Sequence, residues 1–149
     1  MQGKGFAPKK IDTNGLRVGI VTARWNAEYT TNLRDYAYET LRESGVAAQD
    51  IVEMSVPGSF ELPYACQQMI DEENPDVVIA IGVLVKGETM HFEYIAEATT
   101  KGLMDVGLLK EKPVVLGVLT CLTEEQVGTR AGHDEHNHGI SWAQTAIEM

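Results

Sequence analysis

The feature that most constrains the fold is a nearly unbroken apolar run at residues 77–85, which reads VVIAIGVLV. A strand covered on both faces has this composition, and such strands are typical of parallel sheets that lie between helices. The run ends at Lys86-Gly87, and apolar or neutral residues follow at helical spacing from residue 92 to residue 106. We therefore expect a buried strand that leads through a tight, glycine-containing loop into a helix.

Strand and helix signals alternate along the rest of the chain. Strands are predicted at residues 16–22, 51–56, 77–85 and 114–119. Five helices are predicted between and after these strands. The first has an apolar face at 29–41 and ends at Ser44-Gly45, the second is capped by Ser59, and the third is capped by Thr89 and runs to about Leu109. A capping box at Thr123 opens a short fourth helix, and a final helix begins near Ser141.

This alternation implies right-handed crossovers and a four-stranded parallel sheet with helices on both faces. The predicted fold class is α/β, a three-layer αβα sandwich of the flavodoxin-like type. Residues 1–14 hold Gly, Pro and Lys with little pattern, so we expect an extended N-terminal arm. Residues 15–149 are long enough for a single domain with a sizeable core.

Composition excludes several classes of function. The chain has 12 basic and 22 acidic residues, a formal net charge of −10, and no basic stripe, which disfavours a nucleic-acid partner. No apolar run approaches the roughly 18 residues that a membrane span needs, and the N-terminus has no signal-peptide pattern. Cys66 and Cys121 lie far apart without a CxxC motif, which predicts two buried thiols and a cytoplasmic protein.

A binding site is predicted at one edge of the sheet. Ligands of parallel α/β sheets bind beyond the carboxyl ends of the strands. The segments that follow the four predicted strands carry most of the chemically distinctive residues, and they are Arg24-Trp25-Asn26, residues 57–61, residues 83–91 and Thr120-Cys121.

The Gly87-Glu88-Thr89 loop lies where backbone N–H groups lack helical partners and suit a phosphate. The same residues would serve equally well as a turn and cap. Arg130 is a candidate positive partner, although a cation near a helix C-terminus often stabilises only that helix. His91 follows the loop and can carry protons near neutral pH, with a packing role as the alternative.

Trp25 and Phe60 both lie just past strand ends. Two aromatic rings at one edge suit a planar heteroaromatic ligand, with Ser59 and Glu61 as polar contacts, but each ring alone would also suit the core.

A second cluster, at His133, His136 and His138, suggests a metal site with Asp134 and Glu135 nearby. Its spacing matches no standard zinc pattern, so no metal is predicted.

Three segments carry a resemblance to a known family. They are VPGSFELP at 56–63, GVLVKGETMHFEY at 82–94 and RAG…HNHG at 130–139, and they strongly resemble the 6,7-dimethyl-8-ribityllumazine synthases from about Leu16 to Met149. The resemblance implies condensation of 5-amino-6-(D-ribitylamino)uracil with (S)-3,4-dihydroxy-2-butanone 4-phosphate, the penultimate step of riboflavin biosynthesis. It also implies that no metal or organic cofactor is needed.

The resemblance also implies roles for individual residues. His91 takes the proton-transfer position. The implied substrate contacts are Trp25 on the pyrimidine ring with Asn26 beside it, Ser59, Phe60 and Glu61 on the ribityl chain, the backbone of Val83, Leu84 and Val85 on the ring, and the N–H groups of Glu88 and Thr89 on the phosphate with Arg130.

Family members form pentamers, some of which assemble further into icosahedral shells. The resemblance therefore implies a homo-oligomer in which Leu116, Arg130 and His138 reach the active site from the neighbouring subunit. Many relatives have an aromatic residue where this chain has Leu116, so stacking from the neighbour is weaker here. Many have Lys where this chain has His138, which makes that contact sensitive to pH.

Two other classes of function fit the same scaffold. A non-catalytic flavin- or lumazine-binding protein would use Trp25 and Phe60 but would have little need of Arg130 and the phosphate loop. A purely shell-forming protein would need none of them. A nicotinamide enzyme is disfavoured because no GxGxxG motif follows the first strand.

Overall fold

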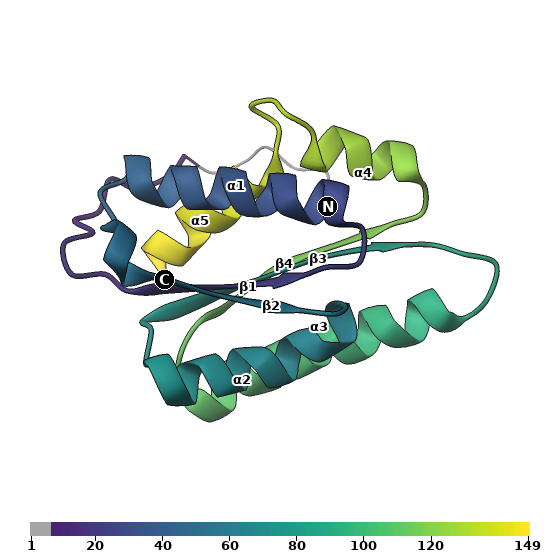
Figure 1. Cartoon of the computed structure of the whole chain (residues 1–149), viewed down its shortest axis with the longest axis horizontal. Helices are drawn as coiled ribbons and strands as arrows, with labels where there is room; N and C mark the ends of the chain where they lie inside the picture. The colour runs from purple at the N-terminus through teal and green to yellow at the C-terminus, as the bar shows by residue number, and fades with distance from the viewer. Residues whose placement is uncertain (1–6) are drawn as a thin grey trace.

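The computed structural model describes residues 7–149 and contains one parallel sheet (Figure 1). Its strands are β1 (Val18–Ala23), β2 (Ile51–Val56), β3 (Val77–Val85) and β4 (Val114–Cys121), in the order β2-β1-β3-β4. The helices are α1 (Ala27–Glu43), α2 (Leu62–Glu73), α3 (His91–Lys110), α4 (Glu124–Ala131) and α5 (His138–Glu148). The predicted α/β fold with a four-stranded parallel sheet is confirmed, and the strand order is of the flavodoxin-like type.

The sheet is the middle layer of three. Helices α1, α4 and α5 cover one face, and α2 and α3 cover the other (Figure 1). Each face has its own apolar cluster: Leu33, Leu41 and Ala143 pack on one side, and Leu62, Met69 and Leu103 on the other. Strand β3 pairs with β1 and with β4, and its residues 77–83 are all buried. The apolar run at 77–85 thus lies between neighbours on every side, as the sequence predicts.

Several element bounds differ from the prediction: β1 begins at Val18 rather than residue 16, the N-cap of α3 is Met90 rather than Thr89, and β4 ends at Cys121 rather than residue 119. Helix α5 begins at His138 rather than near Ser141, because the Asn137 side chain caps it by accepting the Gly139 N–H at 2.8 Å and donates to the Gly132 carbonyl at 2.8 Å. Ser59 does not cap α2. It begins a 3-10 turn, Ser59–Glu61, in which the Glu61 carboxylate accepts the Gly58 N–H at 2.9 Å.

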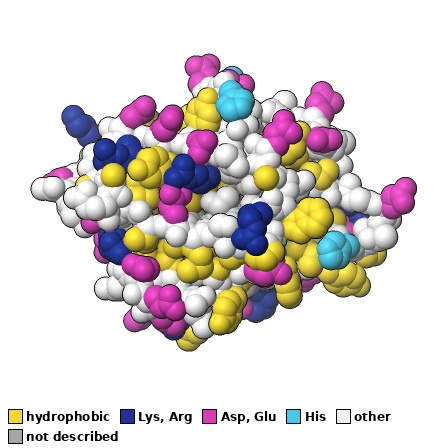
Figure 2. Space-filling model, in the orientation of Figure 1, with side chains coloured by type: hydrophobic (Ala, Val, Ile, Leu, Met, Phe, Trp, Pro, Cys, Tyr) yellow, Lys and Arg dark blue, Asp and Glu magenta, His cyan; other side chains and the backbone are white. Residues whose placement is uncertain are grey.

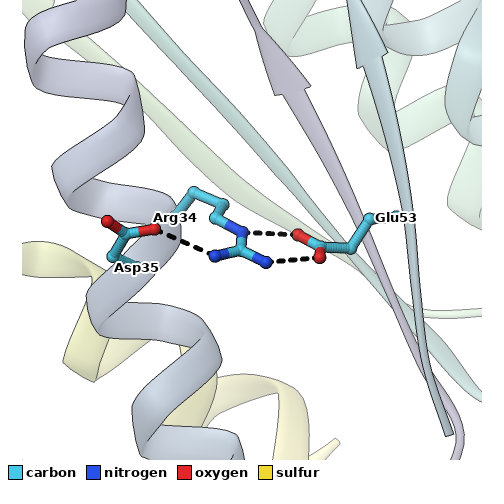
Figure 3. Close-up of polar contacts among 3 residues, drawn as sticks. All are labelled: Arg34, Asp35 and Glu53. Atoms are coloured by element: carbon cyan, nitrogen blue, oxygen red, sulfur yellow. Dashed lines mark hydrogen bonds and ion pairs between the residues drawn. The ribbon is translucent and has the colours of Figure 1, made fainter. Parts of the chain in front are cut away.

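Helix α1 is bound to the edge strand β2 by Arg34 (Figure 3). Its guanidinium donates to both carboxylate oxygens of Glu53 and, at 2.9 Å, to Asp35. The guanidinium carbon also lies 4.6 Å from the Tyr38 ring centroid. The Glu53 carboxylate raises the pKa of Arg34 above its already high value. A bidentate pair of this kind fixes both position and orientation, so it holds the middle of α1 beside the edge strand β2.

Residues 7–13 of the predicted arm form neither helix nor strand, and residues 1–6 of that arm lie outside the described residues. The Thr13 hydroxyl donates to the Ser44 carbonyl at 2.8 Å, and Lys9 pairs with Glu148 at 3.5 Å. Cys66 and Cys121 are free and buried, as predicted. Over residues 7–149, no helix combines the length and the hydropathy that crossing a membrane requires.

Candidate active site

A cleft of about 530 Å³ opens at the carboxyl ends of β1 and β3. The residues that line it come from three separate segments of the chain, and they are Trp25, Asn26, Gly58, Ser59, Phe60, Glu61, Val83, Leu84, Val85, His91 and Ile95. Hydrophobic side chains gather at this end of the molecule, where β3 leads into α3 (Figures 1 and 2). Three of the four segments that the sequence places at this edge therefore meet around one hollow.

The loop after β1 is bound to its neighbours by its backbone. The Arg24 N–H donates to the Val56 carbonyl at 2.8 Å, and the Trp25 N–H donates to the Pro57 carbonyl at 3.0 Å. Asn26 adopts a left-handed conformation with φ of 60°, and its side-chain amide donates to the Val83 carbonyl at 2.8 Å. Asn26 thereby connects this loop to the end of β3 and fixes the distance between two walls of the cleft.

Asn26→Ala is expected to lower the free energy of unfolding by about 2 kcal/mol, since alanine tolerates the left-handed conformation poorly and loses the bond to Val83. Asn26→Gly, which accepts the backbone conformation but also lacks the amide, should cost only about half as much. Urea denaturation of both variants measures the difference. Equal losses in the two variants would show that the left-handed backbone contributes nothing.

The turn at residues 58–61 lies beside this loop and forms another wall of the cleft. Ser59 is buried, its carbonyl accepts the Thr99 hydroxyl at 3.2 Å, and it packs directly on Gly82 of β3. A Cβ atom at Gly82 would lie 2.4 Å from the Ser59 Oγ atom, so the glycine inside the apolar run is what lets this turn approach the strand. The turn then directs Phe60 outward.

The two aromatic residues of the cleft are not part of the core. Trp25 is 74% exposed and Phe60 is 60% exposed. Burial of large aromatic surface is strongly favourable, so exposed rings that face one cleft are typical of ligand contacts rather than of packing. The structure thus contradicts the alternative that the sequence left open, in which these rings roll over the sheet edge into the core.

His91 is the first residue of α3 and is exposed at the cleft. The backbone N–H of His91 donates to the Thr89 hydroxyl at 3.3 Å. Thr89 lies one residue before Met90, which is the N-cap of the helix. The exposed loop of Gly87, Glu88 and Thr89 leads into this helix end, where the first N–H groups have no helical partner. Glu88 and Thr89 do not line the cleft themselves but lie on the chain between Val85 and His91, which do.

Three predicted site residues lie elsewhere. Leu116 is on β4 and borders apolar grooves beside α3 and α5. Arg130, in the last turn of α4, donates to the Gln126 carbonyl at 2.8 Å and to the Thr129 hydroxyl at 3.1 Å. His138 begins α5, with its ring edge-on to Trp142 at 6.0 Å. None of the three lines the cleft.

Arg130 and His138 share one electrostatic environment. Burial, and then the positive charge of Arg130, lower the pKa of His138. The His138 imidazole is therefore biased toward its neutral form, in which it can either donate or accept a hydrogen bond. A cation and a neutral imidazole side by side suit an anionic or polar ligand that approaches from outside the chain.

A model of the 6,7-dimethyl-8-ribityllumazine synthase family matches residues 15–149. The chain belongs to this family. The synthase of that name from Schizosaccharomyces pombe is 49% identical over 98% of this chain and 93% of its own length. The synthase from Pyricularia oryzae is 40% identical over 100% of this chain and 94% of its own length. The synthase from Aquifex aeolicus is 42% identical over 94% of this chain and 91% of its own length.

Two residues that line the cleft, Gly58 and Ile95, were not predicted as site residues from the sequence. Ile95 lies one helical turn after His91, so the spacing of four residues was an available signal for a shared face. Gly58 borders the cleft because a Cβ atom there would lie 3.1 Å from the Trp25 Cδ1 atom. Thr120 and Cys121 were predicted at this edge but do not line the cleft, since β4 lies on the side of β3 away from β1 and β2, whose following loops form the cleft.

The metal alternative gains no geometric support in this lumazine synthase family member. Across residues 7–149, no three side chains of metal-ligating type come together closely enough to hold an ion. His133 and His136 lie in the loop between α4 and α5, where the His136 N–H donates to the Asp134 carboxylate at 2.8 Å.

Proposed function

We propose that the cleft is the site at which 5-amino-6-(D-ribitylamino)uracil and (S)-3,4-dihydroxy-2-butanone 4-phosphate condense to 6,7-dimethyl-8-(D-ribityl)lumazine. As a lumazine synthase family member, the chain is a transferase of riboflavin biosynthesis. The observation that carries the assignment to this site is the cleft itself, in which two exposed aromatic rings meet an exposed histidine at the start of a helix.

Each chemical step moves a proton. The primary amine of the pyrimidine adds to the ketone and water leaves, which gives an imine. Removal of a carbon-bound proton then expels phosphate and leaves an enol, which becomes a ketone. The ribitylamino nitrogen closes the ring with loss of a second water. His91 can accept and return the proton in turn, because a ring nitrogen of a neutral imidazole accepts a proton and donates it again afterwards.

The substrates are held by complementary surfaces. Trp25 stacks on the pyrimidine, Asn26 lies beside it, and the backbone of Val83, Leu84 and Val85 meets the ring. The turn of Ser59, Phe60 and Glu61 holds the ribityl chain. The N–H groups of Glu88 and Thr89 bind the phosphate at the start of α3, where the helix dipole favours an anion both before and after it departs.

Arg130 completes this phosphate site from the neighbouring subunit of a homo-oligomer, a pentamer that can assemble further into an icosahedral shell. Leu116 and His138 come from the same neighbour. Two observations support a composite site: these three residues do not line their own chain's cleft, and apolar side chains stand exposed beside Leu116. Met104, Leu108 and Leu122 line the grooves that Leu116 borders and are all more than half exposed, which is typical of a surface that another protein covers.

We place the enzyme in the cytoplasm, where the two free thiols, Cys66 and Cys121, remain reduced. The reaction needs no metal or organic cofactor in this proposal, because the leaving group is already a stable anion and an imidazole can move every proton.

The assignment is tested by mixing the two substrates with the protein and following lumazine fluorescence. Light scattering on the same sample separates a pentamer from a shell. If lumazine fluorescence increases no faster with the protein than without it, the enzymatic function is contradicted. The alternatives are then a binding protein or a shell-forming protein on the same scaffold.

His91→Ala is expected to lower kcat by only about 10- to 100-fold, because orientation of two substrates supplies much of the rate and the reacting amines can exchange protons with water. Single-turnover fluorescence measures this loss. Complete loss of turnover in a variant that assembles normally would show instead that every step depends on the imidazole.

A further inference from the structure

Lys86 and Glu93 form an ion pair across the base of the loop at residues 87–90. Lys86 directly follows β3, and its N–H donates to the Cys121 carbonyl at 2.9 Å, which fixes it to the end of β4. Glu93 is in the first turn of α3. The Lys86 side chain thus connects a sheet position before the loop with a helix position after it.

The lysine also contacts the loop and its surroundings. The Nζ atom lies 3.5 Å from the Thr89 carbonyl oxygen, within reach of a long hydrogen bond, and 5.9 Å from the Phe92 ring centroid. The four loop residues themselves are exposed, and a Cβ atom at Gly87 would touch nothing within 4 Å. The Lys86 side chain therefore contacts a loop whose own residues are little packed.

The Glu93 side chain is partly exposed, but one of its two carboxylate oxygens is buried. The Glu93 Oε2 atom is buried and has no hydrogen-bond partner among residues 7–149. The Lys86 ammonium lowers the pKa of Glu93, so the carboxylate is charged. A buried carboxylate oxygen is costly when its counter-ion is removed, and a folded loop therefore requires both partners to remain in place.

We infer that Lys86 and Glu93 are a positioning pair for the phosphate: together they hold the loop so that the Glu88 and Thr89 N–H groups and the His91 side chain keep a fixed relative arrangement. This inference rests on the proposed function. Neither residue lines the cleft. The charge of Lys86 is neutralised by Glu93, so the pair acts through loop geometry and not through direct attraction to the substrate.

If Lys86 instead bound the phosphate directly, a substitution of Glu93 would have the opposite effect on phosphate binding. If the lysine itself bound phosphate, neutralising Glu93 would free the ammonium and remove a competing anion, so phosphate would bind more tightly. If the pair positions the loop, neutralising Glu93 releases the loop and phosphate binds more weakly. Glu93→Gln therefore distinguishes the two roles by the sign of its effect.

The experiment is titration calorimetry of inorganic phosphate with the assembled protein, together with KM for each substrate. Lys86→Met and Glu93→Gln are each expected to weaken phosphate binding roughly 3- to 10-fold and to raise KM for the phosphate-bearing substrate by a similar factor. The effect is modest because the ion pair is partly exposed. The double variant should be no weaker than either single one, because the pair acts as a unit. Lys86→Arg should retain most of the affinity.

Matched controls are Lys110→Met and Asp71→Asn, which make the same charge changes in a pair between α3 and α2 with Nζ and Oδ1 atoms 2.8 Å apart, neither of which lines the grooves beside Leu116. They should leave phosphate binding and both KM values unchanged. Thermal unfolding verifies that the Lys86 and Glu93 variants fold. If Lys86→Met does not fold, Glu93→Gln alone decides.

Tighter or unchanged phosphate binding in Glu93→Gln would overturn the positioning pair. If the wild-type protein forms lumazine in that case, only this inference fails. A wild-type protein that neither binds phosphate nor forms lumazine would overturn the proposed function together with it.

Discussion

Arg130→Met is expected to lower kcat/KM for the phosphate-bearing substrate by about 100- to 1,000-fold, the size of effect seen when one charged or oxyanion-binding donor is lost from an active site. The proposed phosphate site otherwise consists of backbone N–H groups beside the acidic Glu88, in a chain of net charge −10. One guanidinium is thus its main positive charge.

The loss should appear in catalysis and not in stability. Among residues 7–149, the Arg130 side chain donates hydrogen bonds within α4 alone, to the Gln126 carbonyl and the Thr129 hydroxyl. Such a contact is worth about 0.5 kcal/mol. Arg130→Lys keeps the charge without the bidentate geometry and should lie between the wild type and Arg130→Met. Steady-state kinetics measures the effect. An unchanged kcat/KM in Arg130→Met would show that this residue does not belong to the phosphate site.

Gly139→Ala is expected to cost about 3 kcal/mol of folding free energy, at the upper end for overpacking. Gly139 is where α5 lies against α1. A Cβ atom there would be 2.2 Å from the Leu33 carbonyl oxygen and 2.9 Å from the Ala37 nitrogen, both of which are backbone atoms that cannot rotate away. The two helices would have to separate, and the Asn137 cap of α5 would be disturbed with them.

The matched control is Gly128→Ala, an exposed helical glycine of α4 with nothing within 4 Å of a Cβ atom. It should stabilise the chain by about 0.5–1 kcal/mol, because alanine has the higher helix propensity. Guanidinium unfolding of the two variants should give changes of opposite sign. A Gly139→Ala protein as stable as the wild type would mean that α1 and α5 pack less tightly than the structure indicates.

The sequence predicted the sheet well because its strands are either fully buried or closed by clear turn residues. The run at 77–85 is apolar throughout since β3 has a strand on each side and helices on both faces. Local polar geometry was harder to predict. Ser59 has good capping chemistry, yet Glu61 satisfies the Gly58 N–H, and Asn137 starts α5 three residues early.

The site was predictable as far as one chain contains it. Parallel strands place their carboxyl ends at one edge, so Trp25, Phe60 and His91 were expected near one another, and all three line the cleft. No pattern of burial or spacing within one chain assigns Leu116, Arg130 or His138 to that cleft. Arg130 was a candidate partner of the phosphate loop by its charge, but its place in the neighbouring subunit, and the roles of Leu116 and His138, came from the family resemblance alone. Contacts between subunits leave no periodic signal in the sequence.

The composite site is the central claim, and subunit complementation tests it most directly. One chain carries Trp25→Ala with His91→Ala, which damages the cleft, and the other carries Arg130→Met. Equal amounts are unfolded together and reassembled, with each variant reassembled alone for comparison. If Arg130 acts in the neighbour's cleft, about a quarter of the sites in a randomly mixed ring combine an intact cleft with an intact arginine, and lumazine formation should recover to about that fraction of the wild-type rate. A mixture no more active than the two variants assayed separately would contradict the account.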